Sequence, residues 1–464
     1  MATTYLSKTQ VTGTSTRKMT ISAWVKIADP SVAYAAGAIW SMGSDSSNFI
    51  ELQFNDANRL ELRAKNGGSY VLRKATNALF KDTSAWYHIV VGVDSDQVSG
   101  PDRNKIYING VQYAGTWDTD TDATINTDFK MNSSSEDARC GRDFMSGAAA
   151  YFDGDMAHVH YIDGTQYAAS DFGETDATSG IWVAKTSPSV TYGNNGGFYK
   201  FASGSSGADS SGNGNTMAVS GTLTNLKDNP DNNYATWNPL YMPTSDFPVF
   251  TNANTTLESQ DGSGDYWGSG STLGMTTGKW YAEFKVIGSS TNKPSFGITQ
   301  SPGKHAYDTN WIGNKPYDYV YLSTGEKVSN DVPTSSWGDT FTTDDIIGVA
   351  VDLDNNKIYF AKNGTWQASG DPTSGSTGTG AAYTITSVAA SDMTGDNAEG
   401  AYYFAFSDQS TGSAKTSANF GNGYFGTTVV SSAGTSSSGD DSIWEYDCPT
   451  GYYGLNTKNL GSYS

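Results

Sequence analysis

The sequence has little cysteine, little positive charge and few charged residues of any kind. Cys140 and Cys448 are its only cysteines, and we expect two buried, inert thiols rather than a disulfide framework or a thiolate metal site. Charged residues make up 16% of the 464 positions, and 28 Lys and Arg against 48 Asp and Glu leave a net charge of −20. No run of Lys or Arg interrupts this negative field, so we expect no nucleic-acid binding.

Long apolar segments are also missing. Nothing approaches the roughly 18 consecutive apolar residues of a membrane-spanning helix. The beginning of the chain has no continuous apolar stretch of the kind found in a secretory signal. We therefore expect a soluble chain that is made in a cytoplasm, inserts into no membrane and is used as translated.

Glycine and aromatic residues are abundant instead. The chain holds 52 Gly, 12 Trp, 28 Tyr and 19 Phe. This aromatic content excludes a fully disordered chain. Its dilution by Gly, Ser, Thr and Asn is typical of short strands separated by many turns. At roughly 150 residues per domain, the length predicts two or three domains.

Alternating apolar and polar residues predict strands in the first part of the chain. In residues 19–27 the apolar side chains from Met19 to Ile27 occupy every second position and so share one face. Similar runs, most of them bounded by Gly, Asn, Asp or Ser, occur at 48–54, 59–64, 69–75, 86–94, 105–113 and 154–164. This spacing is typical of an all-β sandwich.

The composition then changes twice along the chain. Beyond residue 165, Gly, Ser, Asn and Asp predominate around isolated aromatic residues, which predicts an ordered, loop-rich connector that packs against the sandwich. A second series of strands follows, in which Asn355 and Asn356 predict a hairpin with a two-residue turn. We therefore predict an all-β fold with the divisions 1–165, 166–250, 251–430 and a C-terminal segment, 431–464.

Two groups of motifs resemble known families. The pieces TISAWVK, WYHIVVGVD, KIYINGV and FDGDMAHVHYIDG, in this order, resemble a laminin-G-like, concanavalin A-type jelly roll over Ile21 to Gly164. The pieces GKWYAEFKV, SFGIT, WGDTFTTDDIIGVAVDLDNNKIYFAKNGT and SANFG resemble a SPRY domain over Gly278 to Gly421. The resemblance implies two concanavalin A-like, jelly-roll β sandwiches joined by the connector.

The connector and the closing piece PTGYYGLNTKNL resemble segments of virion proteins from marine tailed phages, in which such a jelly roll precedes a SPRY-like domain. This resemblance implies a structural protein exposed on the particle as a tail fibre, tail or head appendage. The implied partners are other virion proteins, further copies of the chain in a homo-oligomer, and a host cell-surface glycan. The alternatives are a capsid decoration or fibre protein without a receptor role, and a polysaccharide depolymerase.

Concanavalin-like folds also host glycosidases, so catalysis is judged from the residues. Such enzymes need two carboxylates around the scissile bond, usually from an E-x-D-x-x-E strand, and the sequence has no such run. We interpret Glu283 as a sheet residue and expect no enzyme. His158 and His160 lie two apart on one predicted strand, a spacing compatible with zinc, but no third ligand is placed and a scaffold role is favoured.

Two candidate binding sites remain. Asp94, Asp96 and Asp102 either form a calcium site outside the EF-hand pattern or belong to a solvated acidic loop, and we expect no other cofactor.

A glycan site needs aromatic rings with polar groups beside them. Trp311, Tyr317, Tyr319 and Tyr321 occupy a loop-to-strand stretch of the SPRY-like block, a family that uses loops at one end of its sandwich for recognition. They are the predicted ligand-binding residues. The alternative is that these rings pack beneath long loops.

Overall fold

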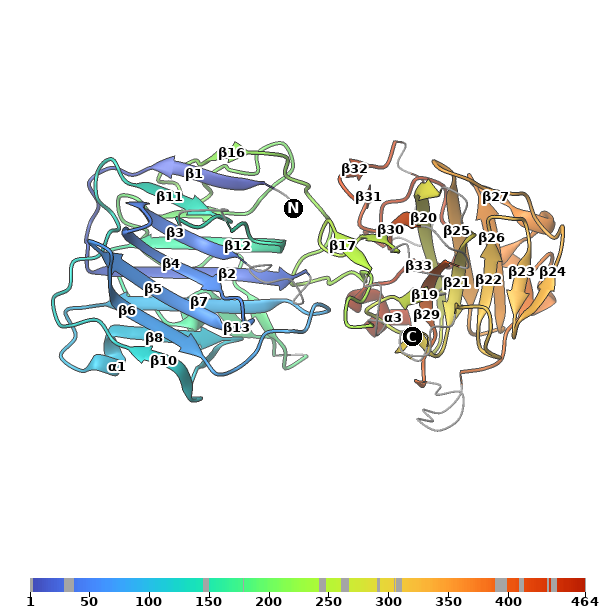
Figure 1. Cartoon of the computed structure of the whole chain (residues 1–464), viewed down its shortest axis with the longest axis horizontal. Helices are drawn as coiled ribbons and strands as arrows, with labels where there is room; N and C mark the ends of the chain where they lie inside the picture. The colour runs from blue at the N-terminus through green and yellow to red at the C-terminus, as the bar shows by residue number, and fades with distance from the viewer. Residues whose placement is uncertain are drawn as a thin grey trace. The chain divides into compact units, whose positions relative to one another are not determined.

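The chain is nearly all β in the computed structural model, as predicted (Figure 1). The structure describes residues 3–28, 37–144, 150–177, 179–241, 248–259, 267–289, 293–303, 305, 311–388, 399–408, 413–431, 434 and 440–463. They form two compact units. Unit 1 comprises Met1–Asn225 and Asn229–Asp231, and unit 2 comprises Leu226–Asp228 and Asn232–Ser464. The predicted connector is shared between the units, with its larger part in unit 1.

Unit 1 is built from two antiparallel sheets. Sheet A has the order β10 (Trp117–Thr121), β6 (Ser69–Thr76), β5 (Leu60–Asn66), β4 (Asn48–Phe54), β3 (Ala38–Asp45), β11 (Asp137–Cys140), β1 (Tyr5–Thr9) and β16 (Ala218–Ser220). Sheet B has the order β15 (Gly197–Tyr199), β12 (Gly154–Asp163), β2 (Lys18–Ile27), β7 (Tyr87–Asp94), β8 (Asn104–Ile108) and β9 (Val111–Gln112). A hairpin of β13 (Gly173–Thr175) and β14 (Trp182–Ala184) follows.

The core of unit 1 follows from strand alternation. On β2 every second side chain from Met19 to Ile27 is buried in the core, as predicted. Ile50 and Leu52 on β4 belong to the same core cluster, which also contains Trp40. Full burial of one such side chain stabilises the fold by about 1.5–3 kcal/mol, so this face fixes the register of each strand.

Unit 2 also contains two large sheets. Sheet C has the order β17 (Val249–Thr251), β18 (Thr256–Glu258), β30 (Ala414–Asn419), β20 (Lys279–Ser289), β25 (Ile346–Asp352), β26 (Lys357–Lys362) and β27 (Thr365–Trp366), with β28 (Tyr383–Thr384) on β26 and β33 (Tyr453–Gly454) on β20. Sheet D has the order β19 (Trp267–Gly270), β29 (Tyr403–Asp408), β21 (Pro294–Thr299), β22 (Tyr319–Leu322), β23 (Lys327–Ser329) and β24 (Val332–Thr334). A small hairpin joins β31 (Tyr424–Phe425) and β32 (Thr428–Val429).

The predicted hairpin of unit 2 exists, but its turn is longer than predicted. Asp352 pairs with Lys357, so four residues rather than two connect β25 and β26. Only the second asparagine, Asn356, has a positive φ, of 55°. Asp352 holds the longer turn, because its carboxylate accepts hydrogen bonds from the backbone N–H and the side-chain amide of Asn355 at 2.9 and 2.8 Å.

The C-terminal segment is an integral part of unit 2. Trp444, Cys448 and Tyr452 are buried in one cluster with Tyr281 and Tyr359 of sheet C. β33 pairs in parallel with β20, and the helix α3 (Thr457–Tyr463) follows it. Among the described residues, no helix has the length and apolar character needed to cross a bilayer.

Candidate functional site

The structure places three of the four predicted ligand-binding rings inside unit 2. Trp311 and Tyr319 are 5% exposed and Tyr321 is fully buried. The Tyr321 hydroxyl donates a hydrogen bond to the backbone carbonyl of Asp339. Tyr317 is half-buried. Trp311, Tyr319 and Tyr321 belong to the apolar clusters of the sandwich and offer no open face to a sugar. Their burial agrees with the alternative interpretation, that these rings have a packing role.

The three candidate calcium ligands are paired with cations of the chain. Their ion pairs, 3.2–3.4 Å long, join Asp94 and Asp96 to Lys18, Asp96 also to Arg17, and Asp102 to Lys105. Within the described ranges, no group of three His, Cys, Asp or Glu side chains could hold a metal ion. The structure thus gives these carboxylates ammonium and guanidinium partners.

The histidines of sheet B serve packing. A bulge between Ala157 and His160 interrupts the alternation of β12, and His158 within it has a φ of 47°. The ring of His160 stacks on Phe198 at 3.9 Å, and its Nδ1 forms a 2.9 Å hydrogen bond with the hydroxyl of Tyr192. The ring of His160 is thus engaged by neighbours, as the favoured scaffold role requires.

His88 has a defined protonation state. Trp182 Nε1–H donates to its Nδ1 at 2.9 Å, and its Nε2 lies 2.9 Å from Ser22 Oγ. Because an indole N–H can only donate, Nδ1 must accept and Nε2 carries the proton. Burial lowers the pKa of His88 to about 3, in keeping with this neutral ring. His88 therefore fixes β14 against sheet B.

Sheet A holds two buried carboxylates that the search for a single acidic strand missed. Glu51 lies on β4 and Glu61 on β5, and both are fully buried. Arg63 Nε donates to Glu51 Oε1 at 2.5 Å, and Arg73 Nε donates to Glu61 Oε1 at 2.6 Å. Gln53 Nε2 donates to the second oxygen of Glu61 at 2.8 Å. Each carboxylate is paired with a guanidinium group. Neither is therefore free to act as an acid or a base on a substrate.

Glu283 on β20 is a buried carboxylate with neutral partners. It accepts hydrogen bonds from the backbone N–H groups of Glu445 and Tyr446 at 2.8 and 2.9 Å. The amide of Asn419 and the hydroxyl of Tyr281 donate to it at 3.2 Å. Burial raises its pKa to about 7. Glu283 thus anchors the C-terminal segment, in agreement with its interpretation as a sheet residue.

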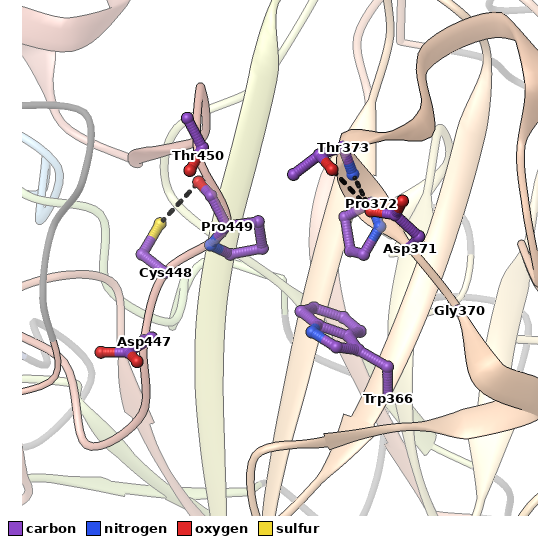
Figure 2. A pocket seen from close by; sticks show the side chains of 9 residues that line it. All are labelled: Trp366, Gly370, Asp371, Pro372, Thr373, Asp447, Cys448, Pro449 and Thr450. Carbon is purple, nitrogen blue, oxygen red and sulfur yellow. Dashed lines mark hydrogen bonds between the residues drawn. The ribbon is translucent and has the colours of Figure 1, made fainter.

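The most suitable open site is a pocket of about 440 Å³ in unit 2 (Figure 2). It lies between the stretch that follows β27 and residues 447–450 of the C-terminal segment. The rings of Trp366, Pro372 and Pro449 point toward the space between the two segments (Figure 2). Its polar lining residues are Asp371, Thr373, Asp447 and Thr450.

Local interactions hold the walls of this pocket. The half-buried ring of Trp366 ends the β26–β27 hairpin and packs against Tyr281 and Tyr359, with ring centres 6.3 and 6.5 Å away. Asp371 accepts hydrogen bonds from the backbone N–H and hydroxyl of Thr373 at 2.9 and 2.6 Å, which starts the short 3-10 helix η3 (Pro372–Thr377). An apolar ring with hydroxyl and carboxylate groups beside it suits a sugar, which has C–H faces and hydroxyls.

A second pocket, of about 570 Å³, lies in unit 1 and is less suited to a sugar ring. It is lined by residues 12–17, 128 and 132–134, which are mostly Thr, Ser and Gly. Across it, Arg17 Nε donates to Asp128 at 2.9 Å. No aromatic residue belongs to its lining, so it lacks the flat apolar surface that the pocket beside Trp366 provides.

Comparison with known proteins identifies a family for each large unit. Residues 2–165 match the concanavalin A-like lectin/glucanases superfamily (Laminin_G_3), and residues 279–394 match the SPRY domain. With them the prediction of two concanavalin A-like, jelly-roll sandwiches is confirmed. The comparison with curated proteins gave no match.

Solved SPRY structures are similar to part of the chain. The SPRY domain of human HERC1 is 16% identical, with 39% of this chain and 96% of that chain covered and a TM-score of 0.30. Another human SPRY domain is also 16% identical, with 37% and 93% covered and a TM-score of 0.28. Stonustoxin is 15% identical, with 40% and 27% covered and a TM-score of 0.27.

Proposed function

We propose that this chain, which carries a concanavalin A-like laminin-G domain and a SPRY domain, is a non-enzymatic protein displayed on the particle of a marine tailed phage. There it attaches to a glycan of the host surface through the pocket beside Trp366. The proposed partners are other virion proteins, further copies of the chain and the glycan. Closed symmetry is the usual form of such assemblies.

The pocket beside Trp366 carries the proposal of glycan attachment. It combines the half-buried indole with exposed threonine and aspartate side chains around one space of about 440 Å³, and two buried prolines complete its lining. Its lining contains no Lys or Arg. A sugar can place a C–H face on the indole and donate hydroxyl hydrogen bonds to Asp371 or Asp447. The geometry therefore favours a neutral sugar over an anionic one.

The state of the buried carboxylates supports binding without turnover. A glycosidase needs two carboxylates about 5–9.5 Å apart with the scissile bond between them. Glu51 and Glu61 are held by arginines, and Glu283 is enclosed by four hydrogen-bond donors. Each of these groups is fully buried.

Display on a particle is supported by the resemblance of the connector and the closing segment to phage virion proteins. The acidic surface is consistent with exposure to salt water, because at about 0.15 M salt the Debye length is about 8 Å and repulsion between like charges is short-ranged. The protein carries a net charge of −20.

A glycan array tests attachment. We expect the protein to bind a small set of neutral glycans, and Trp366→Ala to lose at least tenfold in affinity, the scale of a lost aromatic contact at a binding hot spot. Trp337→Ala is the matched control, because Trp337 is a half-buried tryptophan of the same unit outside the pocket. Equal binding by the Trp366→Ala variant and the wild type would remove the pocket from the proposal.

Cryo-EM or immunogold localisation on intact particles tests display. Density at a tail tip or fibre supports receptor attachment. Density spread over the capsid favours the decoration alternative, and absence from particles rejects a virion role. Release of reducing sugars from host polysaccharide, abolished by one Asp or Glu substitution, would instead establish a depolymerase.

A further inference from the structure

Tyr70 in unit 1 is an exposed ring with two cations close to it. It lies on β6 directly opposite Lys65 of β5. Lys65 Nζ is 4.6 Å and Arg73 Cζ is 5.1 Å from the centre of the Tyr70 ring. Tyr70 is 38% exposed, and the side chain of Arg73 is 39% exposed. The ring and both cations can therefore be reached from solvent.

These residues share the outer face of sheet A. Ala64, next to Lys65 on β5, and Leu72, next to Arg73 on β6, are buried in the core between the sheets. Lys65 and Arg73 therefore point to the other side of the sheet, since neighbouring side chains on a strand alternate. The outer face also carries the Arg63–Glu51 and Arg73–Glu61 pairs.

The cations on this face differ in how they are paired. Glu51 pairs with Arg63 and Glu61 pairs with Arg73, and both carboxylates are buried beneath the cations. Among the described residues, no carboxylate lies within ion-pair distance of Lys65 Nζ. The solvent side of this group therefore presents a guanidinium group and an ammonium group without a paired carboxylate in the described part of the chain.

Unit 1 contains all the arginines of the chain, which is otherwise strongly acidic. All seven arginines lie between residues 17 and 142, although the protein as a whole has a net charge of −20. Arg73 uses Nε for Glu61. A guanidinium group has five N–H donors, so its terminal nitrogens remain able to bind an additional anion.

We infer that Tyr70, Lys65 and Arg73 form a second binding site, specific for an acidic polysaccharide. A carboxylate or sulfate oxygen on a sugar accepts hydrogen bonds from the ammonium and guanidinium groups, and the sugar ring rests against Tyr70. This geometry requires both an anion and a ring. A free inorganic anion can bind the cations but has no ring to place against Tyr70. A neutral sugar can contact Tyr70 but has no anion for the cations.

This site is independent of the pocket beside Trp366. That pocket is lined by Asp371 and Asp447 and by no basic residue, so it disfavours the anions that Lys65 and Arg73 attract. The two sites lie in different units. One can therefore fail experimentally without the other.

Binding of the full chain to three immobilised polymers tests the inference. We expect polygalacturonate or dextran sulfate to be bound at low salt, and neutral dextran not to be bound. Lys65→Gln and Tyr70→Ala should each weaken binding by about tenfold, the scale of one lost charge-assisted hydrogen bond or ring contact. Both positions reach solvent, so the fold is retained and circular dichroism can verify it.

The matched control is Lys81→Gln. Lys81 is an exposed lysine of the same unit, and its substitution changes the net charge by the same amount. Unchanged binding by the Lys81→Gln variant supports a local site, whereas an equal loss would show a general charge effect and overturn it. Failure to bind either acidic polymer, or equal binding of neutral dextran, would also overturn it.

Two further arms refine the result. Preference for polygalacturonate assigns a carboxylate as the anion, and preference for dextran sulfate assigns a sulfate ester. Inorganic sulfate at the same sulfate concentration should compete poorly, and full competition would reduce the site to one for a simple anion. Trp366→Ala should leave acidic-polymer binding unchanged, which separates this inference from the proposed function.

Discussion

The buried glutamates of the two units are stabilised in different ways. In unit 1, Glu51 and Glu61 face the guanidinium groups of Arg63 and Arg73. Unit 2 contains no arginine, and its buried Glu283 accepts hydrogen bonds from two backbone N–H groups, an amide and a hydroxyl. The first solution compensates charge with charge, and the second uses neutral dipoles. The two should therefore respond differently to mutation.

The largest effect is expected from removing the cation that pairs with Glu51 in unit 1. Arg63→Met leaves Glu51 buried without its partner, which should lower the free energy of unfolding of unit 1 by about 3–5 kcal/mol. Hydrogen exchange of the whole protein, followed by mass spectrometry, reports each unit separately. We expect faster exchange in β3 to β6 and unchanged exchange in unit 2. Unchanged protection in sheet A would show that the ion pair contributes nothing to stability.

Removing the anchor of unit 2 should have a smaller and more local effect. Glu283→Ala leaves the backbone N–H groups of Glu445 and Tyr446 without acceptors, at a cost of about 1–3 kcal/mol for each buried unsatisfied group. We expect exchange to increase in residues 440–463. Glu283→Gln is the control, because its amide oxygen preserves part of the hydrogen bonding. A retained C-terminal segment in the Glu283→Ala variant would mean that the apolar cluster around Trp444 holds it alone.

Two buried groups, Glu283 in unit 2 and His88 in unit 1, should contribute pH dependences of opposite sign. The pKa of Glu283 is raised to about 7 by burial, so its contribution to stability is present below its ordinary pKa of 4.5 and is lost as the pH rises toward 7. The pKa of His88 is lowered to about 3, so its contribution is present above 6.5 and is lost as the pH falls toward 3. Between pH 5 and 7, each should change the stability of its unit by about 2 kcal/mol.

Comparison with non-titrating variants isolates these two groups. The difference between wild type and Glu283→Gln should grow with pH in unit 2, because only the wild type ionises there. The difference between wild type and His88→Gln should grow as the pH falls in unit 1. Parallel pH profiles for wild type and variant would contradict the assigned shift. Thermal unfolding from pH 5 to 7, with hydrogen exchange to assign the units, provides the measurement.

The sequence predicted the parts of the fold that depend on local pattern. Alternation over residues 19–27 located β2 and its buried face, because the core selects every second residue whatever the rest of the chain does. It also located the hairpin of β25 and β26. It did not give the length of the turn, since Asp352 closes a four-residue connection through its side chain, a contact that strand patterning does not specify.

The sites depend on residues that are distant in the sequence. The pocket beside Trp366 needs residues 447–450, which reach it only because the C-terminal segment packs on sheet C. The carboxylates of sheet A lie on neighbouring strands, so strand register is needed to see that Arg63 and Arg73 neutralise them. Aromatic residues near a loop led to the prediction that Tyr319 and Tyr321 bind a ligand. The structure instead buries both rings in the core of the sandwich.

The smallest effect is expected at a surface ion pair of unit 1. Arg17 bonds to Asp128 at 2.9 Å, and the two side chains are 36% and 61% exposed. Arg17→Met should change the free energy of unfolding far less than Arg63→Met, because water and salt screen an exposed pair and both side chains lose entropy when they form it. Denaturation at low and high salt, beside Arg63→Met, measures the contrast. If both variants were equally destabilised, burial would not be the reason that arginine matters in sheet A.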